Sequence, residues 1–137
     1  MTPTIWRWTL LGLGLIYVAL ASWALTAPAS FAATLANFGP GDQHLVRDFG
    51  ACSAAFGIGL VVAARKPSWR TPVLTITTLW NGLHAINHII DSGKSHPAAV
   101  GPIEAALLVA ATLLLAFLAR ASTQRASTQR TSTEGDS

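Results

Sequence analysis

Charged residues are scarce in this sequence. They make up 11% of its 137 residues, whereas about 25% of the residues in an average soluble domain are charged. A soluble helical protein needs charged side chains around every helix, but here the 9 Lys and Arg and the 6 Asp and Glu lie mainly at the ends of apolar segments or in the C-terminal tail. Because 51% of the residues are hydrophobic, we expect an integral membrane protein whose main partner is the lipid bilayer.

Cysteine is almost absent as well, and its scarcity excludes several kinds of site. Cys52 is the single cysteine, so the chain has neither an intrachain disulfide nor a CxxC metal or redox motif. Ala, Ser and Phe surround Cys52, which predicts a small side chain buried in helix packing. The formal net charge is +3, but the basic residues are scattered rather than interleaved with aromatic residues. We therefore expect no nucleic-acid partner.

Long apolar segments are present four times. Each approaches the length of about 20 residues that an α-helix needs to cross the hydrocarbon core of a bilayer. They predict an all-α fold, a bundle of four transmembrane helices within residues 1–120, with spans at about 6–25, 45–64, 71–90 and 103–119. Residues 121–137 contain the repeat ASTQR twice and no large apolar side chain, so a disordered cytoplasmic tail is expected there.

The first segment, 6–25, is interpreted as a spanning helix. A cleaved signal peptide is the alternative, because Arg7 precedes the apolar run and the small residues at 27–33 offer a cleavage site. The apolar run is longer than a usual signal core, however, and its aromatic residues are typical of membrane anchors. These are Trp6, Trp8, Tyr17 and Trp23.

Residues 26–43 form the longest connection between predicted spans. Pro28 and Pro40 limit it, and three apolar side chains predict a short helix lying in the membrane interface. These side chains are Phe31, Leu35 and Phe38. In the next span, glycines at 50, 57 and 59 predict a close approach to a neighbouring helix.

The basic residues predict the orientation in the membrane, because cytoplasmic segments retain Lys and Arg. They gather in the turn between the second and third spans and in the tail, as Arg65, Lys66, Arg70, Arg120, Arg125 and Arg130. Four spans then place both termini in the cytoplasm and the loops 26–43 and 92–102 outside. We expect a multi-pass protein of the cytoplasmic (inner) membrane.

Polar residues enter three of the spans from the extracytoplasmic side. His44 and Asp48 are four residues apart, as are His84 and His88, so each pair lies on one helix face. Ionisable groups in a bilayer cost about 2.5–3.5 kcal/mol each and usually face the bundle interior. The pattern predicts one pocket, in which Arg47 neutralises Asp48 or Glu104. Its lining is His44, Arg47, Asp48, Asn81, His84, His88 and Glu104.

Three kinds of ligand fit this composition. Histidines with carboxylates are ligands for Zn, Fe or Cu and for haem iron, and the metal ligands would then be His44, Asp48, His84 and His88. The residues between His84 and His88 lack the Glu of HExxH, which disfavours a hydrolytic zinc enzyme. A quinone or another small redox ligand would instead hydrogen-bond to His and Asp against Trp80 and Phe49.

Two further interpretations need no ligand. Proton or ion movement across the whole membrane is disfavoured, because the inner halves of the spans carry no continuing ionisable chain. Alternatively, the polar residues only hold helices together. The protein would then be a non-catalytic accessory subunit of a homo-oligomer or larger membrane complex, which contacts its partners through Gly12, Gly14, Gly57 and Gly59.

The segment HLVRDFGA, residues 44–51, follows the first span and a proline-containing loop. Here the chain resembles an uncharacterised family of small four-helix bacterial membrane proteins of the actinobacterial type, DoxX-like in architecture. The family pattern pairs HxxRDxG with a His-containing third span, which His84 and His88 match, while Gln43 stands where the family usually has Glu. DoxX-like proteins are associated with membrane redox and quinone chemistry, so the resemblance implies a redox accessory role.

Overall fold

The computed structural model describes residues 2–35, 37 and 42–134, and all regular structure in this part of the chain is helical. The helices in chain order are α1 (Pro3–Thr26), α2 (Pro28–Leu35), α3 (Gln43–Arg65), η1 (Pro67–Trp69), α4 (Arg70–Asp91), η2 (Ser92–Lys94) and α5 (Val100–Glu134). Three of them are long and apolar enough to cross a membrane, namely α1, α3 and the Val100–Arg125 part of α5. The predicted all-α class is thus confirmed for the described residues, and three of the four predicted spans are long and apolar enough to cross a membrane.

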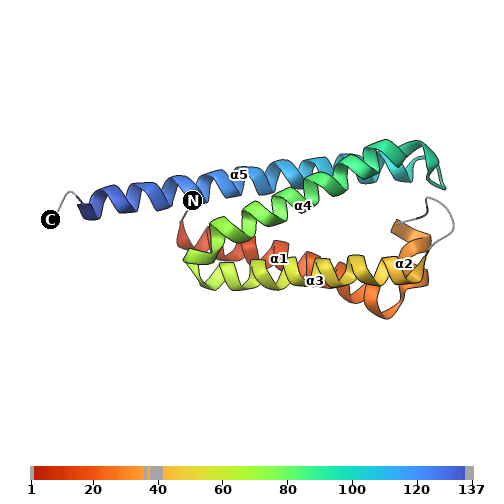
Figure 1. Ribbon diagram of the computed structural model, residues 1–137, viewed down its shortest axis with the longest axis horizontal. Helices are drawn as coiled ribbons and strands as arrows, with labels where there is room; N and C mark the ends of the chain where they lie inside the picture. The colour runs from red at the N-terminus through yellow and green to blue at the C-terminus, as the bar shows by residue number, and fades with distance from the viewer. Residues whose placement is uncertain (1, 36, 38–41, 135–137) are drawn as a thin grey trace.

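The four long helices run alternately up and down beside one another (Figure 1). Helix α1 packs mainly on α3 and α4 mainly on α5, with a smaller contact between α3 and α4. The N-terminus and the α3–α4 turn lie at one end of the bundle, which we call the basic end after Arg7, Arg65, Lys66 and Arg70. The start of α3, the end of α4 and the start of α5 lie at the other end, which we call the histidine end after His44, His88 and His96.

Local sequence signals explain where the helices begin and end. The Thr2 hydroxyl accepts a hydrogen bond from the Ile5 N–H at 3.3 Å, and Pro3 occupies the first helical position of α1, where its missing N–H costs nothing. Asp42 caps α3 by accepting from the His44 N–H at 2.8 Å. Pro67 follows the last turn of α3 and opens η1, because proline cannot continue the hydrogen-bond ladder.

The apolar core lies at the basic end, where all four long helices meet. It consists of Trp6, Leu10, Leu60, Ala63, Ala64, Leu74, Leu115 and Leu118. Trp6 is fully buried and the Arg70 guanidinium lies 5.3 Å from its ring centroid. The prediction of an interfacial anchor is therefore wrong for Trp6, whose ring faces the helix core, whereas Trp8 is exposed as an anchor requires.

Small residues bring α1 and α3 together. A Cβ added to Gly14 would stand 2.9 Å from the Gly57 carbonyl oxygen, and a Cβ added to Gly57 would stand equally close to the Gly14 carbonyl oxygen. This mutual contact confirms the predicted close approach in the 45–64 span. Gly14 and Gly57 are consequently used inside the chain and are not available to an external partner, while Gly12 has open space in front of it.

The outer faces of the helices are apolar, which accounts for the low charge of the chain. Many large hydrophobic side chains are exposed along them, including Leu15, Ile58, Ile76, Leu83, Leu107, Leu113 and Phe117. Cys52 also lies on such a face and is exposed. The prediction of a buried packing residue is wrong for Cys52, because the neighbouring Ser53 occupies the buried position of α3 instead.

The segment after α1 and the C-terminal segment differ in how well their sequences predict their structure. The predicted short helix after Pro28 is present as α2, in which Phe31 packs against Ala24 and Val46; Phe38 lies outside the described residues. The expected tail, in contrast, is helical as far as Glu134, as a continuation of α5. No Gly or Pro interrupts residues 103–134, and the Ser122 hydroxyl shares a hydrogen bond of 2.8 Å with Thr71 Oγ1, so α5 continues without a stop signal.

Candidate functional site: a buried histidine–glutamate cluster

His88 and Glu104 form a close, largely buried pair between α4 and α5. The His88 Nδ1 lies 3.5 Å from Glu104 Oε2, and only 13% of each side chain is exposed. His88 is three residues from the end of α4, and Glu104 is in the first turns of α5, so the η2 connection folds the two helices back and brings the residues face to face. The predicted convergence of these two residues is present in the structure.

The carboxyl group of Glu104 has few partners for a buried polar group. Both of its oxygens are shielded from solvent, and neither accepts a hydrogen bond from a described residue. Buried carboxylates normally accept several hydrogen bonds, because each unsatisfied lone pair retains the cost of its desolvation. His88 is therefore the nearest ionisable partner of Glu104, and the acceptor positions of the carboxyl oxygens are not used by the described residues.

His84 extends the cluster by one turn into a set of stacked rings. Its imidazole centroid lies 4.6 Å from that of His88 in an edge-on arrangement, and 6.1 Å from the ring of Trp80, to which it is nearly parallel. Phe49 of α3 lies 5.3 Å away from the same imidazole. The stack continues from Trp80 to Phe56 at 5.6 Å. These rings give the histidine pair a flat aromatic flank, built from α3 and α4.

Asn81, another predicted pocket residue, is occupied by hydrogen bonds within the protein. It accepts a bond of 2.8 Å from the Tyr17 hydroxyl and donates to the Leu108 carbonyl and the Thr112 hydroxyl at 3.0 and 2.8 Å. It thereby joins α1, α4 and α5. The sequence suggests a membrane anchor at Tyr17, but its hydroxyl lies in the middle of an apolar span. A hydroxyl in such a position needs a hydrogen-bond partner inside the protein.

The α3 residues of the predicted pocket lie elsewhere. His44 Nε2 is 3.6 Å from Asp48 Oδ2, but the two side chains are 83% and 62% exposed. Arg47 is also exposed and pairs with neither Asp48 nor Glu104 among the described residues. The inward face of α3 is marked by Val46, Gly50 and the buried residues that follow them. His44 and Asp48 are each two positions from Val46, about 200° around the helix, so they point away from that face.

The predicted metal ligands are consequently not gathered at one point. Structural and catalytic metal ions take three or four protein ligands at distances near 2 Å. In the described part of the chain, no group of three or more His, Cys, Asp and Glu side chains is close enough to hold a metal ion. His84 and His88 remain together, whereas His44 and Asp48 form a separate exposed pair.

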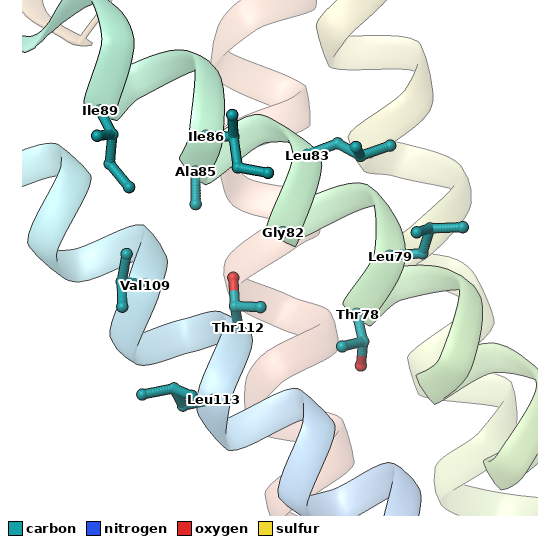
Figure 2. Close-up of a pocket in the computed structure, with 10 residues that line it drawn as sticks. All are labelled: Thr78, Leu79, Gly82, Leu83, Ala85, Ile86, Ile89, Val109, Thr112 and Leu113. Carbon is teal, nitrogen blue, oxygen red and sulfur yellow. The ribbon is translucent and has the colours of Figure 1, made fainter.

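An apolar groove follows the contact between α4 and α5, with a volume of about 470 Å³. Figure 2 shows its lining side chains along both helices, including Ile86 and Ile89 of α4 and Val109 and Leu113 of α5. Gly82 leaves the backbone of α4 bare at its base, opposite Thr112. The lining of this groove includes neither His84, His88 nor Glu104, so the histidine–glutamate cluster lies outside it.

No protein-family model, curated protein or solved structure matches this chain. The resemblance to DoxX-like membrane proteins therefore stays a prediction from the HxxRDxG segment and the histidines of α4.

Proposed function

We propose that the protein crosses the cytoplasmic membrane four times and keeps both termini in the cytoplasm. Helix α4 has 22 residues, enough for a span, and it runs between the two apolar helices α3 and α5. The concentration of Arg and Lys at the basic end supports the orientation, because positively charged segments are retained in the cytoplasm. In this orientation the His88–Glu104 pair belongs to the outer half of the membrane.

We propose further that the cluster of His84, His88 and Glu104 binds a small amphipathic redox ligand of the quinone type. The observation that carries this proposal is the buried Glu104 carboxylate, whose oxygens accept no hydrogen bond from the described residues while His88 stands at 3.5 Å. A quinol hydroxyl can donate to such a carboxylate, and a quinone carbonyl can accept from a histidine N–H. Phe49 and Trp80 supply flat surfaces on which a quinone ring can lie.

A metal centre or a haem receives less support from the same residues. A metal ion held by side chains alone needs ligands that converge on one point, and the described residues contain no such group of three. A haem would need an apolar cavity beside the histidines, and neither groove of the described residues includes them. A hydrogen-bonding ligand makes smaller demands, because one donor, one acceptor and an apolar wall suffice. We therefore place the organic ligand before the metal ion.

The alternative function is that of a non-catalytic accessory subunit in a homo-oligomer or a larger membrane complex. Asn81 supports it, because a polar residue predicted to line the pocket joins three helices through hydrogen bonds instead. If His88 and Glu104 serve the same purpose, they hold α4 against α5 and bind no ligand.

Binding of a short-chain quinone to the purified protein distinguishes the two functions. The protein is titrated in detergent with a benzoquinone that carries a single isoprenoid unit, and binding is measured by equilibrium dialysis. Glu104→Gln keeps the size of the side chain and removes its charge, so we expect an affinity loss of about tenfold, as for one charged hydrogen bond. His44→Gln is the matched control, because His44 is exposed, and its affinity should equal that of the unaltered protein.

The outcome that contradicts the proposal is equally clear. If the unaltered protein binds no quinone, or if Glu104→Gln and His44→Gln bind it equally well, the cluster is not a quinone site. If, in addition, Glu104→Gln lowers the stability of the folded protein, the helix-joining function is supported.

A further inference from the structure

Acidic side chains are confined to one end of the described bundle. The acidic side chains that the structure describes all lie at the histidine end, as Asp42, Asp48, Asp91 and Glu104. At the basic end, Arg65 and Lys66 are exposed and form no ion pair with a described residue. Arg125 of α5 lies near enough to Arg70 for their positive charges to interact. The basic end therefore carries a concentrated positive potential.

A second apolar groove, of about 490 Å³, opens at the same end between α3 and α4. Its mouth is the turn that carries Ser68 and Trp69, which stands between Lys66 and Arg70 in the sequence. Its walls continue along the two helices as Ala55, Phe56, Gly59, Pro72, Val73, Ile76 and Thr77. Gly59 contributes to its depth, since a Cβ at this position would touch Val73 at 3.4 Å.

The basic turn and the apolar groove adjoin each other. An anionic phospholipid has the complementary parts, a negative headgroup and an apolar acyl chain. We propose that the groove holds an acyl chain of an anionic phospholipid, whose phosphate group contacts Arg65, Lys66 and the Ser68 hydroxyl. The basic residues select the negative headgroup, and the groove selects a molecule with a chain. Each basic residue near an anionic surface strengthens such binding by up to about fivefold.

The charged half of this lipid site is separate from the proposed quinone site, because Arg65, Lys66 and Ser68 lie at the opposite end of the bundle from His88 and Glu104. Phe56, in the wall of the groove, stacks on Trp80 and is the point at which the two sites meet. Trp69, which is exposed at the mouth of the groove, is a residue type that prefers the level of lipid headgroups. The site would therefore take a lipid of the bilayer leaflet that surrounds the basic end.

Lipid retention tests the charged half of the site. The full-length protein is equilibrated in micelles with equal amounts of phosphatidylglycerol and phosphatidylcholine, and the lipids that stay bound are counted by native mass spectrometry. We expect phosphatidylglycerol to be retained at least fivefold over phosphatidylcholine. Arg65→Gln with Lys66→Gln should bring this ratio close to one. Arg47→Gln with Lys94→Gln removes the same charge at the histidine end and should leave the ratio unchanged.

Gly59→Leu tests the apolar half, because the larger side chain fills the groove without a change of charge. We expect it to lower the retention of both lipids severalfold, while Gly59→Ala, which adds only a Cβ at contact distance, has a smaller effect. Inorganic phosphate in excess should not displace phosphatidylglycerol. The proposal is overturned if the two charge variants behave alike, if Gly59→Leu retains lipid as before, or if inorganic phosphate competes.

Discussion

Asn81 and the His88–Glu104 pair are two polar groups at the contact between α4 and α5, and they differ in how many hydrogen bonds the protein makes to them. Asn81 is joined to Tyr17, Leu108 and Thr112 by bonds of 2.8–3.0 Å. Glu104 has one partner, His88 at 3.5 Å, and its shielded oxygens accept no hydrogen bond from the described residues. The hydrogen bonds of Asn81 give it a structural role, because they join three helices. The shielded carboxyl group of Glu104 has no such hydrogen bonds, so a structural role does not account for it, and we therefore propose a ligand there.

The two groups also contact different surroundings. Asn81 is buried where α1, α4 and α5 meet, whereas His84 and His88 are bordered by aromatic rings of α3 and α4. A central polar joint fixes the register of helices. Polar side chains next to aromatic rings are the usual composition of a ligand site. If this comparison is right, substitutions at Asn81 should act on stability, and substitutions at the cluster should act on ligand binding.

Replacement of Asn81 should have the largest effect on stability. Asn81→Leu removes three hydrogen bonds and leaves the Tyr17 hydroxyl without its acceptor. We expect the free energy of unfolding to fall by about 2–3 kcal/mol, from about 0.6 kcal/mol per interhelical bond and about 1 kcal/mol for the orphaned hydroxyl. Unfolding with sodium dodecyl sulfate in mixed micelles measures it.

Asn87→Leu is the matched control for this measurement, because Asn87 is an exposed residue of the same type on the same helix. Its stability should equal or exceed that of the unaltered protein, since Asn87 is exposed and the proposed span would place it against lipid. Equal losses for Asn81→Leu and Asn87→Leu would contradict the assignment of Asn81 as the joint between the helices.

Joint replacement of His88 and Glu104 should have the opposite consequence. Substitution of both members of a buried ion pair by apolar residues is often neutral or stabilising, because two desolvated groups are removed together. We expect His88→Leu with Glu104→Leu to leave the free energy of unfolding unchanged or to raise it by about 1–2 kcal/mol, and to abolish quinone binding. A stability loss comparable to that of Asn81→Leu would show that the pair is a helix joint like Asn81.

The sequence predicts the helices well because their signals are local. Apolar runs of about 20 residues determine the long helices, and Pro28 with Phe31 and Leu35 determines α2. The pairing of His88 with Glu104 was also predictable, because an end of one span and the start of the next must share one side of the membrane. The helical continuation to Glu134 differs from the expected disordered tail. The low-complexity repeat predicts disorder, but no Gly or Pro between residues 103 and 134 ends the preceding helix.

The faces of the helices were harder to predict than their limits. The inward face of α3 follows Val46, Gly50, Ser53 and Gly57, at spacings of three and four residues. A helix face defined by these mostly small residues places His44 and Asp48 on the outward side. The bond between Tyr17 and Asn81 joins residues 64 positions apart. It depends on how α1 crosses α4, which no local pattern of residues specifies.

The Tyr17 hydroxyl provides a smaller and more selective test of the joint. Tyr17→Phe removes one donor and leaves the two bonds that Asn81 donates to α5 in place. We expect a loss of about 1 kcal/mol, the usual net contribution of one hydrogen bond. The loss should vanish in an Asn81→Leu background, because the partner is already absent; a double-mutant cycle in mixed micelles measures this coupling. Additive losses would show that Tyr17 contributes through another contact.

The smallest effect is expected at the exposed pair of α3. His44 and Asp48 are 3.6 Å apart but largely exposed, and exposed ion pairs are screened by water and salt. His44→Ala should change the free energy of unfolding by less than about 0.5 kcal/mol. Quinone affinity should also be unchanged, in contrast to His88→Ala. If His44→Ala instead weakens binding as strongly as His88→Ala, the ligand must reach the start of α3, and the four-residue set of His44, Asp48, His84 and His88 would have to be considered one site after all.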